Sequence, residues 1–172
     1  MKIINLPLTD KTIRALKAGD EVLLSGVIYT ARDQAHKRLT ELLKNKKRLP
    51  VCLKNETIYY TGPTACPKNK IIGSCGPTTS SRMDMFTPGL LKAGLKGMIG
   101  KGKRSDYIKN SIKKYGAIYF VTIAGAGALL SKKVLGKELM AFGDLGPEGI
   151  YKLEIQDFPA IVAIDSRGKS IY

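Results

Sequence analysis

The feature that most constrains the fold is a change of hydrophobic period between residues 21 and 45. EVLLSGVIYTA (21–31) is rich in β-branched and apolar residues and predicts a long strand, with Gly26 as a bulge. ARDQAHKRLTELLKN (31–45) continues at once with a helical period, its apolar residues on one stripe and its lysines opposite. A strand that runs directly into an amphipathic helix favours an α/β fold.

Three polar residues, Arg32, Asp33 and His36, lie at this strand-to-helix junction. The carboxyl ends of strands are where α/β folds build their sites, so all three are candidates for positions in or near a site. Structural roles stay open beside this interpretation. Arg32 and Asp33 can form a local ion pair, and His36, the single histidine, can be a buried structural residue or can orient a neighbour.

The rest of the chain predicts shorter elements. We expect a helix at 12–18 capped by Thr9 or Asp10, strands at 57–62, 71–76, 116–123, 149–155 and 160–165, a helical turn ending at Met85, a helix from Thr87 to Gly94, a short helix after the glycine-rich turn at 124–128, and a hairpin turn at 166–168. Strands outnumber long helices. The expectation is therefore a mixed sheet with flanking helices, in one domain that spans residues 1–172.

Length and hydropathy limit the class of protein. A chain of 172 residues with 44% hydrophobic residues can bury the core of one globular domain. The longest apolar stretch, residues 117–130, is diluted by small and polar residues and is shorter than the ~20 residues of a membrane span. The amino terminus carries charges within its first ten residues and has no apolar segment typical of a signal peptide. We expect a cytoplasmic protein with no membrane partner.

The three cysteines predict no metal site within this chain. Cys52, Cys66 and Cys75 form an odd set with spacings of 14 and 9 residues, which match no CxxC pattern. We expect them to be buried as small apolar residues. A second interpretation stays open for Cys75, which lies in the most polar loop and could line a site.

The formal net charge is +15, with 29 basic and 14 acidic residues. Such a charge suits an acidic partner or nucleic acid, and a solvated basic face explains it equally well. Only 7% of residues are aromatic, tryptophan is absent, and no known nucleic-acid-binding motif is present. These features argue against nucleic acid, although a basic nucleic-acid-binding domain remains the alternative from a different functional class.

The segment GSCGPTTSSRMD (73–84) gathers two glycines and five hydroxyl residues around one arginine, Arg82. Two near repeats, Gly-Pro-Thr at 62–64 and again at 76–78, predict two adjacent loops with the same task. We expect Gly76 and the residues after it to present backbone N–H groups at a helix N-terminus, which favours a carboxylate or phosphate. Arg82 would grip the same anion as a planar fork.

Two further cations complete a pattern typical of a site for a small dicarboxylate. Arg32 can supply one, and Lys101, between two glycines, can supply the other or can be a surface lysine. Neither GxxxxGK[ST] nor GxGxxG occurs, which argues against a nucleotide site. Thr78 can be a helix cap or a site residue. Asp84 is expected to anchor a loop or Arg82. Glu148 is expected to be a turn residue.

Some of the groups that catalysis needs are missing from the sequence. With one histidine, no paired carboxylates and no set of metal ligands, the chain offers no complete acid–base pair for hydration or dehydration. If the protein is an enzyme, part of its active site should come from another chain.

Several motifs in order make the sequence resemble one protein family. They are TARDQAHKR (30–38), YYTGPT (59–64), IGSCGPTTSSRMD (72–84), MIGKG (98–102), IAGAGALL (123–130) and DFPAIVAIDSRGKSIY (157–172). The chain resembles the β subunit, or carboxyl-terminal domain, of the iron–sulfur hydro-lyases, the class I fumarases and L(+)-tartrate dehydratases. The resemblance implies a swivelling β/β/α domain. It also implies a partner α subunit that carries a [4Fe–4S] cluster, in an α2β2 assembly.

The resemblance also implies roles for individual residues. Arg32, Arg82 and Lys101 would hold the carboxylates of a C4 dicarboxylate, and Thr78 would be the catalytic base, with positioning of the substrate as its rival role. The implied reaction is the reversible conversion of (S)-malate to fumarate and water, with dehydration of tartrate to oxaloacetate as the alternative. Cys66 and Cys75 depart from the small residues that we expect in relatives.

Overall fold

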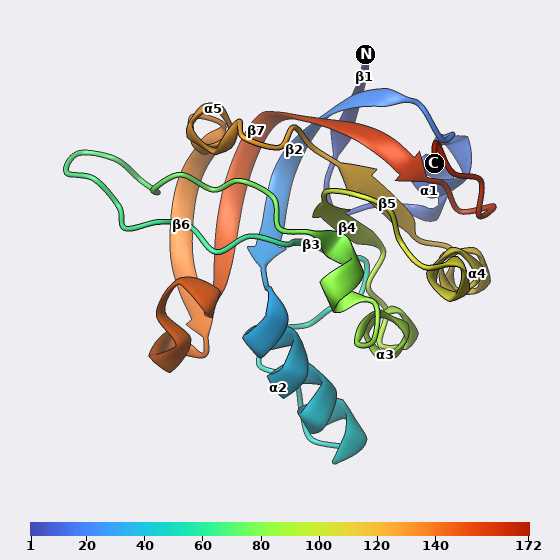
Figure 1. Cartoon of the computed structure of the whole chain (residues 1–172), viewed down its shortest axis with the longest axis horizontal. Helices are drawn as coiled ribbons and strands as arrows, with labels where there is room; N and C mark the ends of the chain where they lie inside the picture. The colour runs from blue at the N-terminus through green and yellow to red at the C-terminus, as the bar shows by residue number, and fades with distance from the viewer.

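The computed structural model describes residues 1–172 and consists of a mixed sheet with flanking helices (Figure 1). The strands are β1 (Lys2–Asn5), β2 (Glu21–Thr30), β3 (Thr57–Tyr59), β4 (Gly97–Gly100), β5 (Ile118–Val121), β6 (Val134–Ala141) and β7 (Ile150–Ile164). The α-helices are α1 (Asp10–Ala15), α2 (Asp33–Lys44), α3 (Thr87–Lys92), α4 (Asp106–Tyr115) and α5 (Gly127–Ser131), and two 3-10 turns are η1 (Ser80–Met83) and η2 (Gly143–Glu148). The α/β class expected from the sequence is confirmed.

The sheet closes on itself. Its strand order is β1-β2-β3-β4-β5-β7-β6, and β2 pairs with β7 as well, so that β2, β3, β4, β5 and β7 form a ring. Neighbours from β1 to β5 run parallel, and β7 is antiparallel to β2, β5 and β6. A closed sheet of this kind is compatible with the swivelling β/β/α domain that the resemblance implies.

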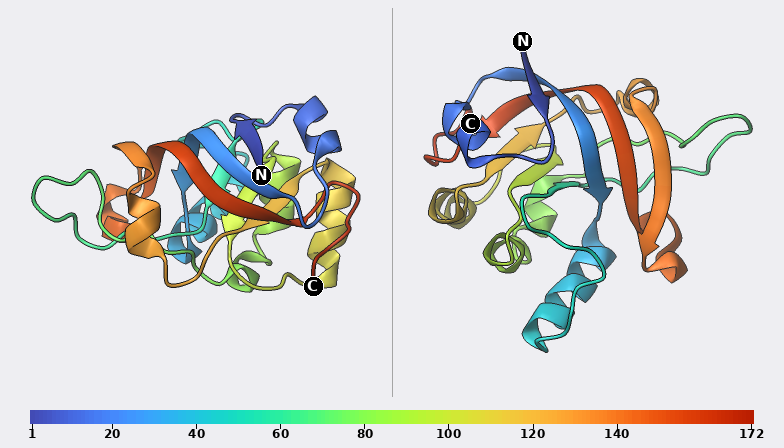
Figure 2. Two further views of the ribbon diagram at one scale, coloured as in Figure 1. Left: turned by 90° about the horizontal axis from the view of Figure 1, so that it is seen from above. Right: turned by 180° about the vertical axis from the view of Figure 1, so that it is seen from behind.

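Two hydrophobic cores lie on the two faces of the ring. Side chains that alternate along the strands point inward or outward, as the period of a strand requires. Tyr59, Ile99 and Phe120 belong to an inner cluster of 20 buried residues, to which α1 and α5 also contribute. Their chain neighbours belong to an outer cluster of 19 buried residues under α2, α3 and α4, which lie together along one side of the ring (Figures 1 and 2).

Most of the expected elements exist with adjusted ends. The hydroxyl of Thr9 accepts a hydrogen bond from the N–H of Thr12 and caps α1, as expected, and the predicted helix from Thr87 is α3. Gly26 is the expected bulge: the register with β7 shifts there and its φ is +127°. A Cβ at Gly26 would lie 2.8 Å from the carbonyl oxygen of Leu6, so the close approach of the β1–α1 loop requires glycine.

Two expectations about strands are wrong. Residues 71–76 form no strand, because this segment is held by hydrogen bonds to Thr64 and Gly127 rather than by a ladder. The strands expected at 149–155 and 160–165 are one continuous strand, β7. The backbone of β7 is irregular at Asp157, which lies between the two expected strands and has φ +50°. The N–H of Asp157 donates to the Ser25 hydroxyl at 3.0 Å.

Four elements were not expected from the sequence: β1, β4, α4 and β6. Strand β4 is only four residues long and begins and ends with glycine, so its sequence has no alternating pattern that would predict a strand. No helix in the structure is both long enough and apolar enough to cross a membrane.

Candidate active site

Two of the candidate residues, Arg32 and Lys101, follow the carboxyl ends of parallel strands of the sheet. Thr30, near the end of β2, pairs with Tyr59 of β3, and Tyr59 pairs with Ile99 of β4, so these strands end in one row. Arg32 comes two residues after β2, and Lys101 directly follows β4. The topology therefore brings the two cations to the same edge of the sheet, as expected for a site in an α/β fold.

The loop that contains Gly76 and Thr78 crosses this edge. The N–H of Thr78 donates to the carbonyl of Tyr60 at 2.7 Å, and the hydroxyl of Thr61 donates to the carbonyl of Gly76 at 2.8 Å. These contacts place the two Gly-Pro-Thr loops side by side, as the near repeat predicted. The hydroxyl of Thr78 itself makes no hydrogen bond within the chain, so it is free to meet a ligand.

Ser80 connects this loop to Lys101. The N–H of Ser80 donates to the carbonyl of Lys101 at 3.0 Å, and the N–H of Lys101 donates to the hydroxyl of Ser80 at 3.1 Å. The phenol of Tyr119 donates to Ser80 Oγ or to the carbonyl of Gly102, each at 2.8 Å. The backbone of Lys101 is therefore fixed from two sides, although its side chain has no partner in the chain.

Arg82 makes a two-pronged ion pair with Asp33. Its Nε donates to Oδ1 at 3.0 Å and its Nη2 donates to Oδ2 at 2.6 Å. The side chain of Arg82 is 51% exposed, whereas that of Asp33 is 25% exposed. The pair joins η1 to the first turn of α2 and leaves about half of the Arg82 side chain exposed.

Arg32 lies between two carboxylates. Its Nε is 3.5 Å from Oδ2 of Asp33 and 3.5 Å from Oε1 of Glu148. Gly62 packs against the same side chain, since a Cβ there would lie 2.9 Å from Arg32 Cδ. Asp33 thus touches both arginines, and the four charged groups form one continuous cluster.

Glu148 was expected to be only a turn residue, and its contact with Arg32 corrects that expectation. It lies in η2, at the connection between β6 and β7, which is 116 positions from Arg32 in the sequence (148 − 32). A second ion pair holds this connection to α2, because both Nη atoms of Arg38 donate to the carboxylate of Asp144 at 2.8 and 2.5 Å. No local sequence signal predicts a contact over such a separation.

The side chain of His36 makes no hydrogen bond to the charged groups of this cluster. It is fully buried, its Nδ1–H donates to the carbonyl of Arg32 at 2.9 Å, and its ring packs edge-on against Tyr60. Burial lowers its pKa to about 4, against which the hydrogen bond to the Arg32 carbonyl acts in the opposite direction. The imidazole is therefore neutral near pH 7, and its burial and its hydrogen bond to the Arg32 carbonyl fit both open roles, a buried structural residue and a residue that orients Arg32.

Asp84 anchors a loop, as expected, but its partner is Arg104 and not Arg82. Arg104 Nε donates to Asp84 Oδ1 at 2.5 Å, and the N–H and hydroxyl of Ser105 donate to Oδ2 at 2.9 and 2.6 Å. Arg104 is buried, with its guanidinium over the ring of Tyr119 at 5.0 Å. A buried arginine is expensive unless it is paired, and here it is fully paired beneath the site.

The expected helix N-terminus at Gly76 is wrong. Gly76 lies four residues before η1, which is a single 3-10 turn, so no helix dipole points at a ligand there. Two of the N–H groups in this loop already have acceptors within the chain: Thr78 donates to the carbonyl of Tyr60, and Ser80 donates to the carbonyl of Lys101. The N–H groups of Gly76 and Thr79 make no hydrogen bond within the chain and remain available as donors.

The three cysteines form no cluster. Cys75 is buried, as expected, with a pKa raised by burial to about 11, but Cys52 and Cys66 are exposed on loops, which contradicts the expected burial of all three. No group of three or more His, Cys, Asp and Glu side chains is placed to hold a metal ion. The residues of this chain do not fit a [4Fe–4S] cluster.

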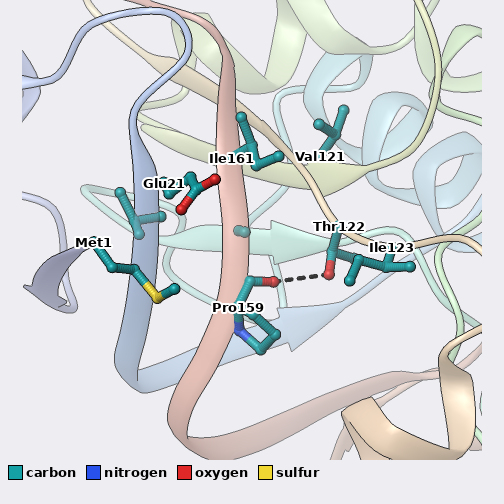
Figure 3. Close-up of a pocket in the computed structure, with 9 residues that line it drawn as sticks. Met1, Glu21, Val121, Thr122, Ile123, Pro159 and Ile161 are labelled. Atoms are coloured by element: carbon teal, nitrogen blue, oxygen red, sulfur yellow. Dashed lines mark hydrogen bonds between the residues drawn. The ribbon is translucent and has the colours of Figure 1, made fainter.

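An apolar hollow of about 300 Å³ is lined by Met1, the start of β2, the end of β5 and part of β7 (Figure 3). Val121, Ile123, Pro159 and Ile161 line it, and the hydroxyl of Thr122 donates across it to the carbonyl of Pro159 at 2.8 Å. Glu21 is its one charged side chain, and a carboxylate there disfavours a dianion. None of the candidate site residues lines this hollow.

The fold and the site together define a class: an α/β domain with a closed sheet and a cluster of cations at the carboxyl ends of its parallel strands. The whole chain, residues 1–172, matches the protein family described as Fumarase C-terminus, and it belongs to that family.

Named relatives agree with this assignment. The chain is 40% identical over 171 residues to the putative L(+)-tartrate dehydratase subunit beta of Methanocaldococcus jannaschii, which covers 96% of this chain and 88% of that protein. It is 37% identical over 151 residues to the aerobic class I fumarate hydratase of Escherichia coli K12 and 36% identical over 156 residues to fumarate hydratase 2 of Leishmania major. These alignments cover 87% and 90% of this chain, which spans only 28% of the length of each fumarate hydratase.

Proposed function

We propose that this chain is the dicarboxylate-binding part of an iron–sulfur hydro-lyase whose reaction is the reversible conversion of (S)-malate to fumarate and water. The observation that supports this most is the convergence of separate segments at one edge of the sheet, which brings together Arg32, Thr78, Arg82 and Lys101. The names of the relatives support the same class of reaction.

In this proposal, the cations hold the two carboxylates of the substrate. Arg82 keeps Asp33 as its structural partner and offers its exposed side to one carboxylate, while Arg32 and Lys101 receive the other. The free N–H groups of Gly76 and Thr79 add neutral donors to the same loop. Asp33 and Glu148 fix the arginines before the substrate arrives, which reduces the entropy lost on binding.

Elimination of water then breaks two bonds of malate. A base removes a proton from C3, the electron pair of the C–H bond becomes the second bond between C2 and C3, and the hydroxyl on C2 leaves with a proton from an acid to form water. We assign the base to Thr78, whose hydroxyl is unbonded within the chain. Its alkoxide form would be stabilised by the neighbouring cations. The rival role for Thr78 is to position the substrate, and the acid in this proposal comes from a partner subunit.

The [4Fe–4S] cluster in this proposal is carried by a separate α subunit, in an α2β2 assembly. Its support is the family resemblance, and the cysteines of this chain provide no set of ligands for such a cluster. When bound, the cluster would act as a Lewis acid on the leaving hydroxyl.

Tartrate is the second candidate substrate. Its support is the 40% identity to the putative L(+)-tartrate dehydratase subunit beta, over 96% of this chain and 88% of that protein. Malate and tartrate both present two carboxylates to the same cations, so the choice rests on contacts with the extra hydroxyl.

The test is anaerobic co-expression of this chain with the larger chain of the same organism that matches the rest of the class I fumarate hydratases. Fumarate formed from malate and oxaloacetate formed from tartrate are measured side by side, with each chain alone as the control. We expect activity only in the pair, with loss on exposure to oxygen, and the faster substrate identifies the reaction. A pair that converts neither substrate would contradict the proposed function.

A further inference from the structure

One segment of the chain projects from the body of the protein. Residues 64–71 are eight consecutive exposed residues, the longest such run in the chain. We call residues 64–72 the arm. Figures 1 and 2 show it as a long loop between β3 and η1 that extends well beyond the sheet and the helices.

The base of the arm is tightly fixed. The N–H of Thr64 donates to the carbonyl of Ser74 at 3.0 Å, and the N–H of Ser74 donates to the hydroxyl of Thr64 at 2.9 Å. A Cβ at Gly73 would lie 2.2 Å from the carbonyl oxygen of Thr64, so the two limbs are in close backbone contact. Ile72 is buried in the inner core and ties the returning limb to the ring.

The tip of the arm also has internal structure. The N–H of Lys70 donates to the carbonyl of Pro67 at 3.2 Å, the thiol of Cys66 donates to the carbonyl of Lys70 at 2.9 Å, and Asn69 adopts φ +61°. A loop with a turn at its tip and a locked base is partly organised in advance, which reduces the entropy cost of binding.

The chemistry of the arm suits a protein partner with acidic groups. Its only charges are Lys68 and Lys70, and no aspartate or glutamate occurs anywhere in residues 57–83. Apolar groups are exposed beside the lysines, including Ile71 at 48%. Lysines orient an acidic partner by electrostatic complementarity, and the exposed Ile71 adds apolar surface that such a partner can cover.

Both limbs of the arm start at the candidate site. Gly62, just before the arm, packs against Arg32, and the residues just after it meet Gly127 and Thr61. A partner that completes this site must therefore pass close to the arm. The fumarate hydratases have 72% of their length outside the part that this chain spans (100% − 28%), which is ample for such a partner.

We propose that the arm is a docking element that inserts into an acidic groove of the larger subunit, beside the active site. This inference rests on the proposed function for the existence of the partner, but it concerns binding and not turnover. It assigns the recognition of the partner to Lys68, Lys70 and Ile71.

The test reverses the charge of the arm in the full chain. The variant Lys68→Glu/Lys70→Glu is compared with Lys113→Glu/Lys114→Glu, which changes two exposed lysines of α4 at the other end of the molecule (Figure 1). The dissociation constant of each variant for the co-expressed larger subunit is measured by titration. The thermal midpoint of each chain alone shows that it is folded.

We expect the arm variant to bind at least about tenfold more weakly, on the scale of lost interfacial charge contacts, and the α4 variant to bind as the wild type does. Ile71→Ser should also weaken binding without changing the thermal midpoint. Equal binding by the arm variant and the wild type would overturn the inference, as would an equal loss in the α4 variant or failure of the wild-type chains to pair. Activity is scored separately, so a wild-type pair that forms but converts neither malate nor tartrate contradicts the proposed function alone.

Discussion

At the scale of single residues, Arg82 is the most informative position, because it has one known partner and a free face. Arg82→Ala should reduce kcat/KM by roughly 30- to 150-fold, since a hydrogen bond to a charged group is worth about 2 to 3 kcal/mol, and most of the loss should appear in KM. Arg82→Lys keeps the charge but loses the planar, two-pronged set of donors. Its kcat/KM should therefore lie between the values of the wild type and of Arg82→Ala. The measurement is steady-state kinetics of the reconstituted pair.

Near-normal kinetics in Arg82→Ala would show that this residue serves only its ion pair with Asp33. Asp106→Ala is a suitable control, because it removes an exposed carboxylate that pairs only with Lys109 on α4.

Thr78 distinguishes catalysis from positioning. If its hydroxyl is the base, Thr78→Ala should reduce kcat by about 100- to 10,000-fold, the usual range for a general base, and Thr78→Ser should restore part of the rate. The N–H of Thr78 keeps its bond to Tyr60 in both variants, so the loop should stay in place. A rise in KM with an unchanged kcat would assign Thr78 to positioning and leave the base to another group.

His36 gives a prediction about stability and pH. Its pKa is about 4 in the folded chain and near 6.5 in an unfolded one, so between these values the unfolded state binds more protons. The free energy of unfolding should therefore be level above about pH 6.5 and should fall by roughly 2 kcal/mol between about pH 6.5 and pH 5. Urea unfolding at several pH values measures this slope.

The chain has no other histidine, which makes His36→Asn a clean control. The asparagine amide can still donate to the carbonyl of Arg32, but it does not titrate, so the slope above about pH 5 should disappear. An unchanged slope in this variant would mean that other groups cause it.

At the scale of elements, the sequence predicted those with a strong local signal. The change of period at residues 21–45 located β2 and α2, and Thr9 and Thr87 located the starts of α1 and α3. Strand β4 was missed because four residues bounded by glycine carry no period. Helix α4 had signals that could have found it: Ile108 and Ile112 are four apart on its buried face, and Gly116 ends it with φ +60°.

Contact between the α5 turn and the site loop yields a prediction at this scale. A Cβ at Gly127 would lie 2.7 Å from the nitrogen of Gly76, whereas a Cβ at Gly76 would find no atom nearer than 3.7 Å. Gly127→Ala should therefore destabilise the chain by about 1 to 3 kcal/mol, and Gly76→Ala should not. Denaturant unfolding of the two variants checks the difference.

The same pair tests the site. If Gly76→Ala leaves stability unchanged but lowers kcat/KM in the reconstituted enzyme, then a ligand approaches Gly76 closely. If it changes neither quantity, Gly76 is not a binding residue.

At the scale of the whole molecule, the sequence predicted a mixed sheet but not its closure. The ring closes through pairs such as Glu21 with Ile161, which are 140 positions apart (161 − 21), and no local pattern encodes them. For the same reason, Arg32, Arg82 and Lys101 could be selected by type and motif, whereas the contacts of Asp33 with Arg82 and of Glu148 with Arg32 could not.

The arm has a consequence for the free chain, without the proposed larger subunit. Lys68 and Lys70 lie in an exposed turn, where trypsin finds both the residue type and the accessible backbone that it needs. Limited digestion of the free chain should therefore produce one early cut near residue 70 and two fragments. They should stay together, because β2 and β3 on one side of the cut pair with β7 and β4 on the other. Gel electrophoresis with and without denaturant would reveal this nicked form, and an early cut elsewhere in the chain would contradict the expectation.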